Sequence, residues 1–271
     1  MNRFHDPSGS EYAENRVRSS GRWELDPHAF TLALEAHGRD RLPYPLTYRH
    51  EFAESIDVYR ERREAAVRRL LGVYDEELHA AFGALLEPQV RVEIEGLHGP
   101  GQTEVVRVYA GIVGDRCTLV VQAPGPTREH GGAVTISTVA LHALAAEIVA
   151  HLPRVRGGTT PRFQGRRGDL HSPTYGRHPT RLSPTEQVQR FFLRPRSGTG
   201  EITVYPGYQL DARPTSDGRA FLWLDYPDDG RYLLQHTGDE DFTVIPGPPA
   251  ELQHRLTNHI AMFTDRRQLS R

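Results

Sequence analysis

The chain has 271 residues, a formal net charge of −2 from 33 basic and 35 acidic side chains, one cysteine and no lysine. The absence of lysine excludes every site that needs its amine. These sites are a Walker-type phosphate loop, a pyridoxal phosphate Schiff base, a lysine nucleophile and a biotinyl or lipoyl carrier site. The single cysteine excludes an internal disulfide and a multi-cysteine metal site.

Composition and charge favour a soluble, cytoplasmic protein, because mean hydropathy is −0.56 and no apolar run approaches the about 20 residues of a membrane span. Residues 1–21 are polar and aperiodic, so we expect a disordered tail without the apolar core of a Sec signal. A folded domain is expected over residues 22–265, followed by a short tail over residues 266–271.

The first folded segments are predicted from helix-starting residues and prolines. A strand-like stretch, Arg22–Leu25, precedes a helix that begins at Asp26-Pro27 and closes at Gly38. The two prolines of Leu42–Leu46 then predict a rigid, extended connection.

Two more helices are expected, Ser55–Leu71 and Asp75–Leu86. In the first of them the charged residues are expected to face solvent. The residues expected to face the core are Ile56, Tyr59, Ala66, Val67 and Leu70.

From Val90 the hydrophobic period changes from 3.6 to 2. Apolar residues alternate with Arg91, Glu93 and Glu95, which predicts a half-buried strand with a charged outer face. A glycine-rich loop over residues 96–102 follows. The next predicted elements are strands 105–113, 117–123 and 133–137 and a helix over 139–152.

Residues 154–184 are rich in arginine, glycine and proline and nearly free of aliphatic side chains, which predicts a mobile linker or a binding loop. The arginines within 154–181 could contact nucleic-acid phosphates, so a nucleic-acid-associated protein is the alternative function. Few aromatic side chains interleave with them and no nucleic-acid-binding motif is present. The arginines of this segment are Arg154, Arg156, Arg162, Arg166, Arg167, Arg177 and Arg181.

The second half of the chain repeats the pattern of the first at an offset of about 110 residues. Each half, residues 22–153 and 185–265, is predicted to hold a helix, four antiparallel strands and a final helix. One half alone would leave a sheet face or edge uncovered. We therefore expect an α+β, sandwich-like fold: a single pseudo-two-fold domain with a central antiparallel sheet flanked by helices.

No pattern typical of a catalytic or metal site is found. The 14 histidines lack metal-ligand spacing, and no serine lies in a GxSxG motif. Cys117 lies in an apolar strand, which predicts a buried, inert thiol. The acidic pairs Glu93/Glu95 and Asp228/Asp229 are interpreted as surface charge. We expect no enzyme, no cofactor and no metal; a hydrolase would need histidine and aspartate gathered from distant segments.

Several segments together carry a family resemblance. They are Trp23-Glu24-Leu25 before the helix 26–38, Leu42-Pro43-Tyr44-Pro45-Leu46, Leu70-Leu71-Gly72, Gly230-Arg231-Tyr232-Leu233 and Phe242-Thr243-Val244-Ile245-Pro246. In this order they resemble the EspG family associated with type VII (ESX) secretion in actinobacteria. The lysine-free, arginine-rich composition is similar to that of proteins from high-GC actinomycetes.

The resemblance implies a pseudo-symmetric fold with a central antiparallel sheet. It also implies a cytosolic chaperone that binds PE–PPE heterodimers, or related helical substrates of the WXG type, and delivers them for export without catalysis. Neither membrane insertion nor a nucleic-acid partner is expected. A homodimer, through a sheet edge or an exposed binding surface, stays open.

Family members hold the helical tip of the PPE subunit with the loop after the second strand, part of the sheet and the C-terminal helical region. Carried over by position, this implies contacts in the loop 96–102, in the next strand, and in the pseudo-symmetric hairpin 211–218. The implied residues are Leu97, His98, Pro100, Gln102, Arg107, Asp211 and Arg213. The loop 96–102 is shorter and more neutral than the family pattern, which leaves the chemistry of the client open; an ordinary hairpin loop is the alternative interpretation.

Overall fold

The computed structural model describes residues 21–172, 182–209 and 215–268, with side chains up to Asp265. The strands of its first half are β1 (Arg22–Leu25), β2 (Val90–His98), β3 (Glu104–Val113), β4 (Arg116–Pro124) and β5 (Gly131–Ala140). Those of the second half are β6 (Phe163–Arg166), β7 (Gly198–Pro206), β8 (Arg219–Tyr226), β9 (Gly230–His236) and β10 (Asp241–Pro246).

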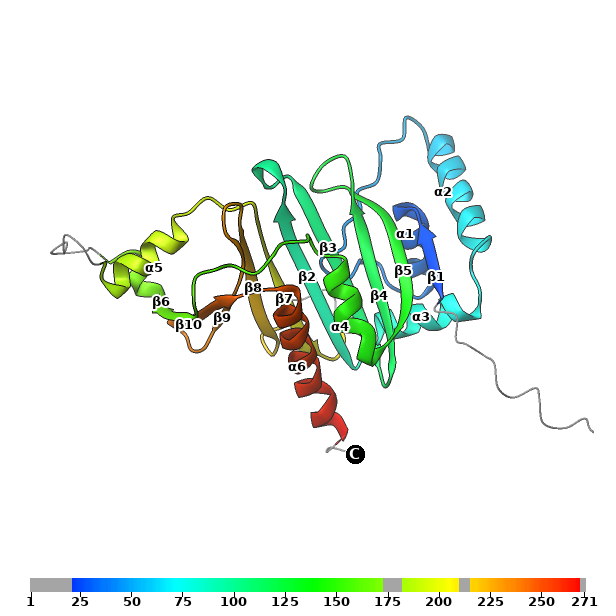
Figure 1. The fold of residues 1–271 in the computed structure, drawn as a ribbon. Helices are drawn as coiled ribbons and strands as arrows, with labels where there is room; N and C mark the ends of the chain where they lie inside the picture. The colour runs from blue at the N-terminus through cyan, green and yellow to red at the C-terminus, as the bar shows by residue number, and fades with distance from the viewer. Residues whose placement is uncertain (1–20, 173–181, 210–214, 269–271) are drawn as a thin grey trace, which may run out of the picture.

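These strands form one antiparallel sheet in the order β1-β5-β4-β3-β2-β7-β8-β9-β10-β6 (Figure 1). The order is symmetric about the β2–β7 pair. On either side the chain runs through four consecutive strands, and a short strand, β1 or β6, completes the edge. The predicted α+β fold with two similar halves around a central sheet is therefore confirmed.

The helices are α1 (Pro27–Ala36), α2 (Ile56–Leu71), α3 (Glu76–Leu86), α4 (Leu141–Ala150), α5 (Pro184–Phe192) and α6 (Pro249–Gln268). Two 3₁₀ turns, η1 (Pro100–Gln102) and η2 (Arg167–Leu170), lie between strands or before α5. The predicted helix starts hold, because Asp26, Ser55 and Asp75 each accept a backbone N–H as the N-cap.

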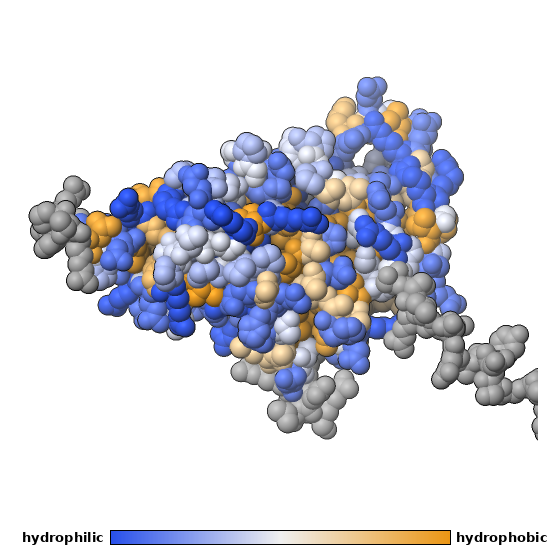
Figure 2. Space-filling view, in the orientation of Figure 1, coloured by the Kyte–Doolittle hydropathy of each residue, from blue (hydrophilic) through white to orange (hydrophobic). Residues whose placement is uncertain are grey.

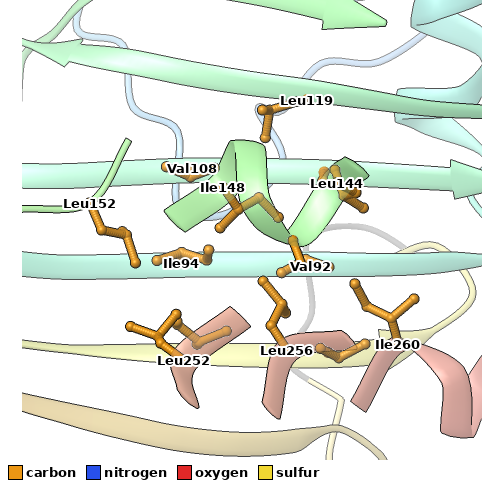
Figure 3. Close-up of a cluster of buried hydrophobic side chains, with 14 of the residues drawn as sticks. Val92, Ile94, Val108, Leu119, Leu144, Ile148, Leu152, Leu252, Leu256 and Ile260 are labelled. Carbon is orange, nitrogen blue, oxygen red and sulfur yellow. The ribbon is translucent and has the colours of Figure 1, made fainter. Parts of the chain in front are cut away.

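One face of the sheet is covered by α4 and α6, the final helices of the two halves, which lie side by side (Figure 1). Val92 and Ile94 of β2 and Val108 of β3 pack against these helices (Figure 3). The helices contribute Leu144, Ile148, Leu152, Leu252, Leu256 and Ile260 to the same cluster. We call this side the α4–α6 face.

The opposite face carries two separate apolar clusters. Over the first half, α1 and α3 pack Phe30 and Phe82 against Tyr109 and strands β4 and β5. Over the second half, α5 packs Phe191 against β8, β9 and β10. The central strands β2 and β7 lie between these two covers.

The prediction that residues 154–184 lack secondary structure is wrong in part. Residues 163–166 form β6, which pairs with β10, and η2 follows directly. Phe163 packs against the α5 cluster, and one aromatic side chain is enough for a four-residue edge strand. Residues 173–181 of this segment, and residues 1–20 of the predicted N-terminal tail, lie outside the described residues.

The prediction of which α2 residues face the core is also partly wrong. Only Ala66 and Leu70 are buried, whereas Ile56, Tyr59 and Val67 are exposed. The reason is that α2 packs on α1 rather than on the sheet, so that only one flank of its apolar face is covered (Figure 1).

Two glycines at the centre of the sheet make room for a tryptophan. Gly96 of β2 and Gly200 of β7 are paired, and the Trp223 indole, fully buried, lies over both. A Cβ added at Gly96 would lie 2.3 Å from Trp223 Cζ2, and one at Gly200 would lie 2.1 Å from Trp223 Cη2. The seam between the halves therefore has no room for a side chain at either position.

We expect Gly96→Ala to lower the free energy of unfolding by about 1–3 kcal/mol, because the added methyl group displaces a buried ring. The matched control is Gly83→Ala in α3, where nothing lies within 4 Å of the added Cβ. There the helix propensity of alanine should raise stability by about 0.5–1 kcal/mol. Urea unfolding of the three proteins measures both effects, and equal stability of the two variants would contradict the prediction.

Candidate functional site

The loop between β2 and β3 is a compact turn held at one end of the sheet. Gly99 and Gly101 have φ of 79° and 67°, a left-handed backbone conformation that would be strained for a residue with a side chain. Gln102 Nε2 donates to the backbone oxygen of Arg196 at 3.0 Å, so the loop is tied to the chain that leads into β7. His98 Nδ1 lies 3.4 Å from Glu104 Oε2 across the base of the loop.

The structure brings four of the predicted binding residues together at this loop. Leu97 is half-buried between its β-partners Val105 and Thr199, His98 is half-buried beside it, and Pro100 is exposed. Gln102 is half-buried by the contact just described. They form one contiguous end of the sheet.

Arg107 is placed differently. It lies on β3 opposite Glu95 and is only 3 % exposed. Its guanidinium donates to the backbone oxygen of Arg128, and desolvation lowers its pKa. Arg107 therefore lies beneath the surface, where it stabilises the sheet. Asp211 and Arg213 lie outside the described residues.

Between the two helical covers of the opposite face lies a strip of the central strands in which Glu201 is exposed and its neighbours are half-buried, Leu222 also packing against the α5 cluster. Its residues are Glu95 and Leu97 of β2, Thr199 and Glu201 of β7, and Leu222 of β8, and we call it the central strip. Leu97 pairs with Thr199 and Glu95 with Glu201 across the two halves. The strip continues directly into the β2–β3 loop.

Two carboxylates face each other in the central strip, an arrangement that costs stability unless other groups bind them. Glu95 Oε2 accepts a 2.5 Å hydrogen bond from the Tyr44 hydroxyl, and burial together with this bond raises the pKa of Tyr44. Glu201 Oε1 accepts a hydrogen bond from Thr203 Oγ1 at 2.8 Å. The acids are thus held in place, and the strip presents acceptors beside apolar side chains.

The interpretation of Glu93 as surface charge is wrong. Glu93 and Arg91 are 6 % and 1 % exposed and form an ion pair, with Arg91 Nε 2.7 Å from Glu93 Oε1. Arg91 also donates to the backbone oxygen of Gly207 and to Thr215 Oγ1, both at 3.0 Å. Burial raises the pKa of Glu93 despite its partner. The pair fixes both ends of the β7–β8 connection to the sheet.

Asp229 is likewise buried rather than a surface charge. Burial opposes the ionisation of Asp229. Its carboxylate nevertheless accepts hydrogen bonds from the Tyr232 hydroxyl at 2.5 Å and from Thr159, and it lies 3.0 Å from the Arg194 guanidinium. These partners lower its pKa. Arg156 Nε donates to the Asp229 backbone oxygen at 3.0 Å. Asp229 therefore anchors the start of the arginine-rich segment to the β8–β9 turn.

Two arginines of the alternative nucleic-acid segment have partners within the chain, although the Arg166 side chain is 70% exposed. Arg156 holds Asp229, and Arg166 Nε lies 3.4 Å from Asp241 Oδ1. Arg177 and Arg181 lie outside the described residues.

The described ranges hold no group of three or more His, Cys, Asp or Glu side chains placed to bind a metal ion. Cys117 is buried, and burial raises the pKa of its thiol to about 12. A hollow of about 120 Å³ beside Tyr109 and another of about 390 Å³ along β6 and β10 contain no histidine or cysteine. Within the same ranges, no helix has the length and apolar character needed to cross a membrane.

Comparison with known proteins decides the family. Residues 26–258 match the sequence profile of the EspG family, which covers most of the chain. This chain belongs to the EspG family. The predicted resemblance to this family is thereby confirmed.

A solved structure agrees with this assignment. The fold is similar to that of the Mycobacterium tuberculosis type VII secretion system chaperone EspG5, solved in complex with a PE25–PPE41 dimer. The TM-score is 0.55 at 12% sequence identity, over 89% of this chain and 96% of that one. No curated protein sequence matches the chain. At 12% identity, the similarity to EspG5 establishes the shared fold.

We expect Arg91→Met to lower the free energy of unfolding by about 3–5 kcal/mol, because Glu93 is left buried without its partner. The double variant Arg91→Met/Glu93→Leu removes both charges and should recover most of that loss. Thermal and urea unfolding measure the difference. A double variant as unstable as the single one would show that the hydrogen bonds of Arg91 to Gly207 and Thr215, rather than its ion pair, dominate.

Proposed function

We propose that this EspG family member is a cytosolic chaperone of a type VII secretion system. It binds a PE–PPE-type heterodimer, or a related helical substrate, keeps it soluble and delivers it for export without catalysis. The observation that carries the proposal is the family match over residues 26–258, together with an open surface where the family is expected to bind its clients.

The proposed binding surface is the central strip with the β2–β3 loop. Leu97 and Leu222 supply apolar contact area, Thr199 and Glu201 supply polar groups beside them, and Pro100 stands exposed at the end. An apolar centre with a polar rim is the usual composition of a specific protein interface. The rim acceptors favour a client tip that carries hydrogen-bond donors or a basic side chain.

The width of the central strip suits a helical client. Three neighbouring strands, β2, β7 and β8, span about 10 Å between the outer two, at about 4.8 Å per strand. An α-helix with its side chains is about 10–12 Å wide. One helix end can therefore lie between the α1–α3 cover and the α5 cover.

Binding alone explains how such a protein would work without ATP. The chain has no lysine, so it has no Walker-type phosphate loop. A helical bundle with an apolar tip tends to self-associate, and covering that tip keeps it soluble. Occupancy then follows from affinity and concentration, and release needs only a competing site at the secretion machine.

We expect Leu97→Asp and Pro100→Asp each to reduce client recovery by about tenfold or more, because each places a carboxylate in the proposed contact. The control is Leu193→Asp, which changes a leucine that is 83% exposed at the end of α5. Tagged protein is isolated from its native cytosol at moderate salt, and co-eluting proteins are identified by mass spectrometry. Circular dichroism shows that each variant is folded.

A stoichiometric PE–PPE-type or WXG-type protein that is lost in both loop variants and kept in Leu193→Asp would support the function and its surface. Equal client recovery in all variants would reject the surface. RNA alone, released as salt rises, would reject the chaperone and favour the arginine-rich segment.

A further inference from the structure

Tyr44 belongs to a short segment that is fixed on both sides of it. Leu46 is only 5% exposed, and Leu42 packs against the same apolar cluster. The Thr47 backbone N–H donates to Gln122 Oε1 at 2.9 Å, and Gln122 Nε2 donates to the Thr47 backbone oxygen at 2.7 Å. A proline on each side of Tyr44 restricts the backbone further. The tyrosine is therefore carried on a rigid support.

The Tyr44 side chain ends on the central strip, and the residue stays 48% exposed. Its hydroxyl donates to Glu95 Oε2 at 2.5 Å. Burial, this hydrogen bond and the nearby charges of Glu95 and Glu201 raise the pKa of Tyr44, so the phenol keeps its proton. A tyrosine that is already fixed loses little conformational freedom on binding, which is a property of the residues that dominate protein interfaces.

The two carboxylates of the central strip differ in how far their charge is compensated. Glu95 has Arg107 opposite it on β3, and Arg128 Nη2 lies 4.0 Å from its Oε1. Glu201 is exposed, and it accepts a hydrogen bond from the neutral Thr203 hydroxyl. Within the described ranges, no basic side chain lies within 4.0 Å of the Glu201 carboxylate. The uncompensated negative charge of the strip is therefore on β7.

We propose that Glu201 and Tyr44 form a subsite for an arginine side chain of the helical client. This inference rests on the proposed function. The guanidinium pairs with the Glu201 carboxylate and lies against the exposed part of the Tyr44 ring. Its aliphatic stem packs on Leu222, which pairs with Glu201 on the neighbouring strand β8. Glu95 is a positioning residue, because it holds the Tyr44 hydroxyl.

An arginine suits this subsite better than a metal ion or a lysine does. The described ranges hold no group of three or more side chains placed to bind a metal ion, and two carboxylates are too few oxygen ligands for calcium. A planar guanidinium binds a carboxylate at its edge and an aromatic ring at its face, whereas an ammonium group does not stack. A cation beside Glu201 also relieves its repulsion with Glu95 across the β2–β7 pair.

The register of the strip predicts where this arginine lies in the client. Leu97 is two residues along β2 from Glu95, which is a separation of about 6.8 Å at about 3.4 Å per residue. One turn of an α-helix rises about 5.4 Å. The client arginine is therefore expected one helical turn from the apolar side chain that contacts Leu97.

The first test measures the affinity of the purified chain for the client that it retains from its native cytosol, by isothermal titration calorimetry. We expect Glu201→Arg to weaken binding by about tenfold or more, because like charges then meet, and Glu201→Gln to weaken it less. Tyr44→Ala, which removes the ring, should cost more affinity than Tyr44→Phe, which keeps it. Circular dichroism and urea unfolding verify that each variant is folded.

The matched control is Glu147→Arg, which makes the same charge change at an exposed position of α4. Figure 2 shows the face of the molecule on which α4 lies, opposite the central strip, where hydrophilic and hydrophobic residues are mixed. This variant should bind the client as the wild type does. Equal loss in Glu147→Arg and Glu201→Arg would overturn the subsite, because the effect would then follow net charge.

The second test identifies the client residue. With Tyr44 replaced by the photoreactive p-benzoylphenylalanine, irradiation of the complex should cross-link a client helix that carries an arginine within one turn of the linked residue. Changing that arginine to glutamate should weaken binding to the wild type and restore binding to Glu201→Arg. A merely structural role of Glu201 would give no such rescue. Cross-links to a segment without arginine, or an exchange without rescue, would overturn the subsite.

Failure of the subsite and failure of the proposed function give different results. If the client is lost in Leu97→Asp but binds Glu201→Arg with wild-type affinity, the function stands and the subsite is wrong. A wild-type chain that retains no helical client rejects the function and the subsite with it.

Discussion

The antiparallel pairing of β2 with β7 is the interaction on which the rest of the fold depends. Nine consecutive residue pairs, from Val90–Pro206 to His98–Gly198, join the two halves into one sheet. These strands are central, so one of their faces lies under α4 and α6, and part of the other face is buried as well. On one side, glycines admit Trp223; on the other, Arg91 and Glu93 neutralise each other. The seam thus combines tight packing around Trp223 with a buried ion pair.

The central strip follows from the symmetry of this seam. The helices of each half cover the outer strands of that half, so on the opposite face neither set reaches the middle. The last helices, α4 and α6, meet over the middle on the other side and close it. An internal duplication of this topology therefore produces one covered and one open central surface. The less covered one is the surface on which the proposed client binding rests.

The sequence predicted the elements and their repetition well because caps and hydrophobic periods are local signals. Asp26, Ser55 and Asp75 cap helices as expected. It failed where the outcome depends on what covers a residue. Alternation in β2 is the same whether the charged side faces water or a partner, so the burial of Glu93 was missed. The central strip also escaped prediction, since Glu95 and Glu201 are brought together only by pairing across the halves.

The edges of the sheet offer little surface for pairing with another chain. Strands β1 and β6 are four residues long, and such short edges offer few backbone groups for adding a strand from another chain. A sheet-edge dimer, one of the possibilities raised by the sequence, would therefore gain few hydrogen bonds.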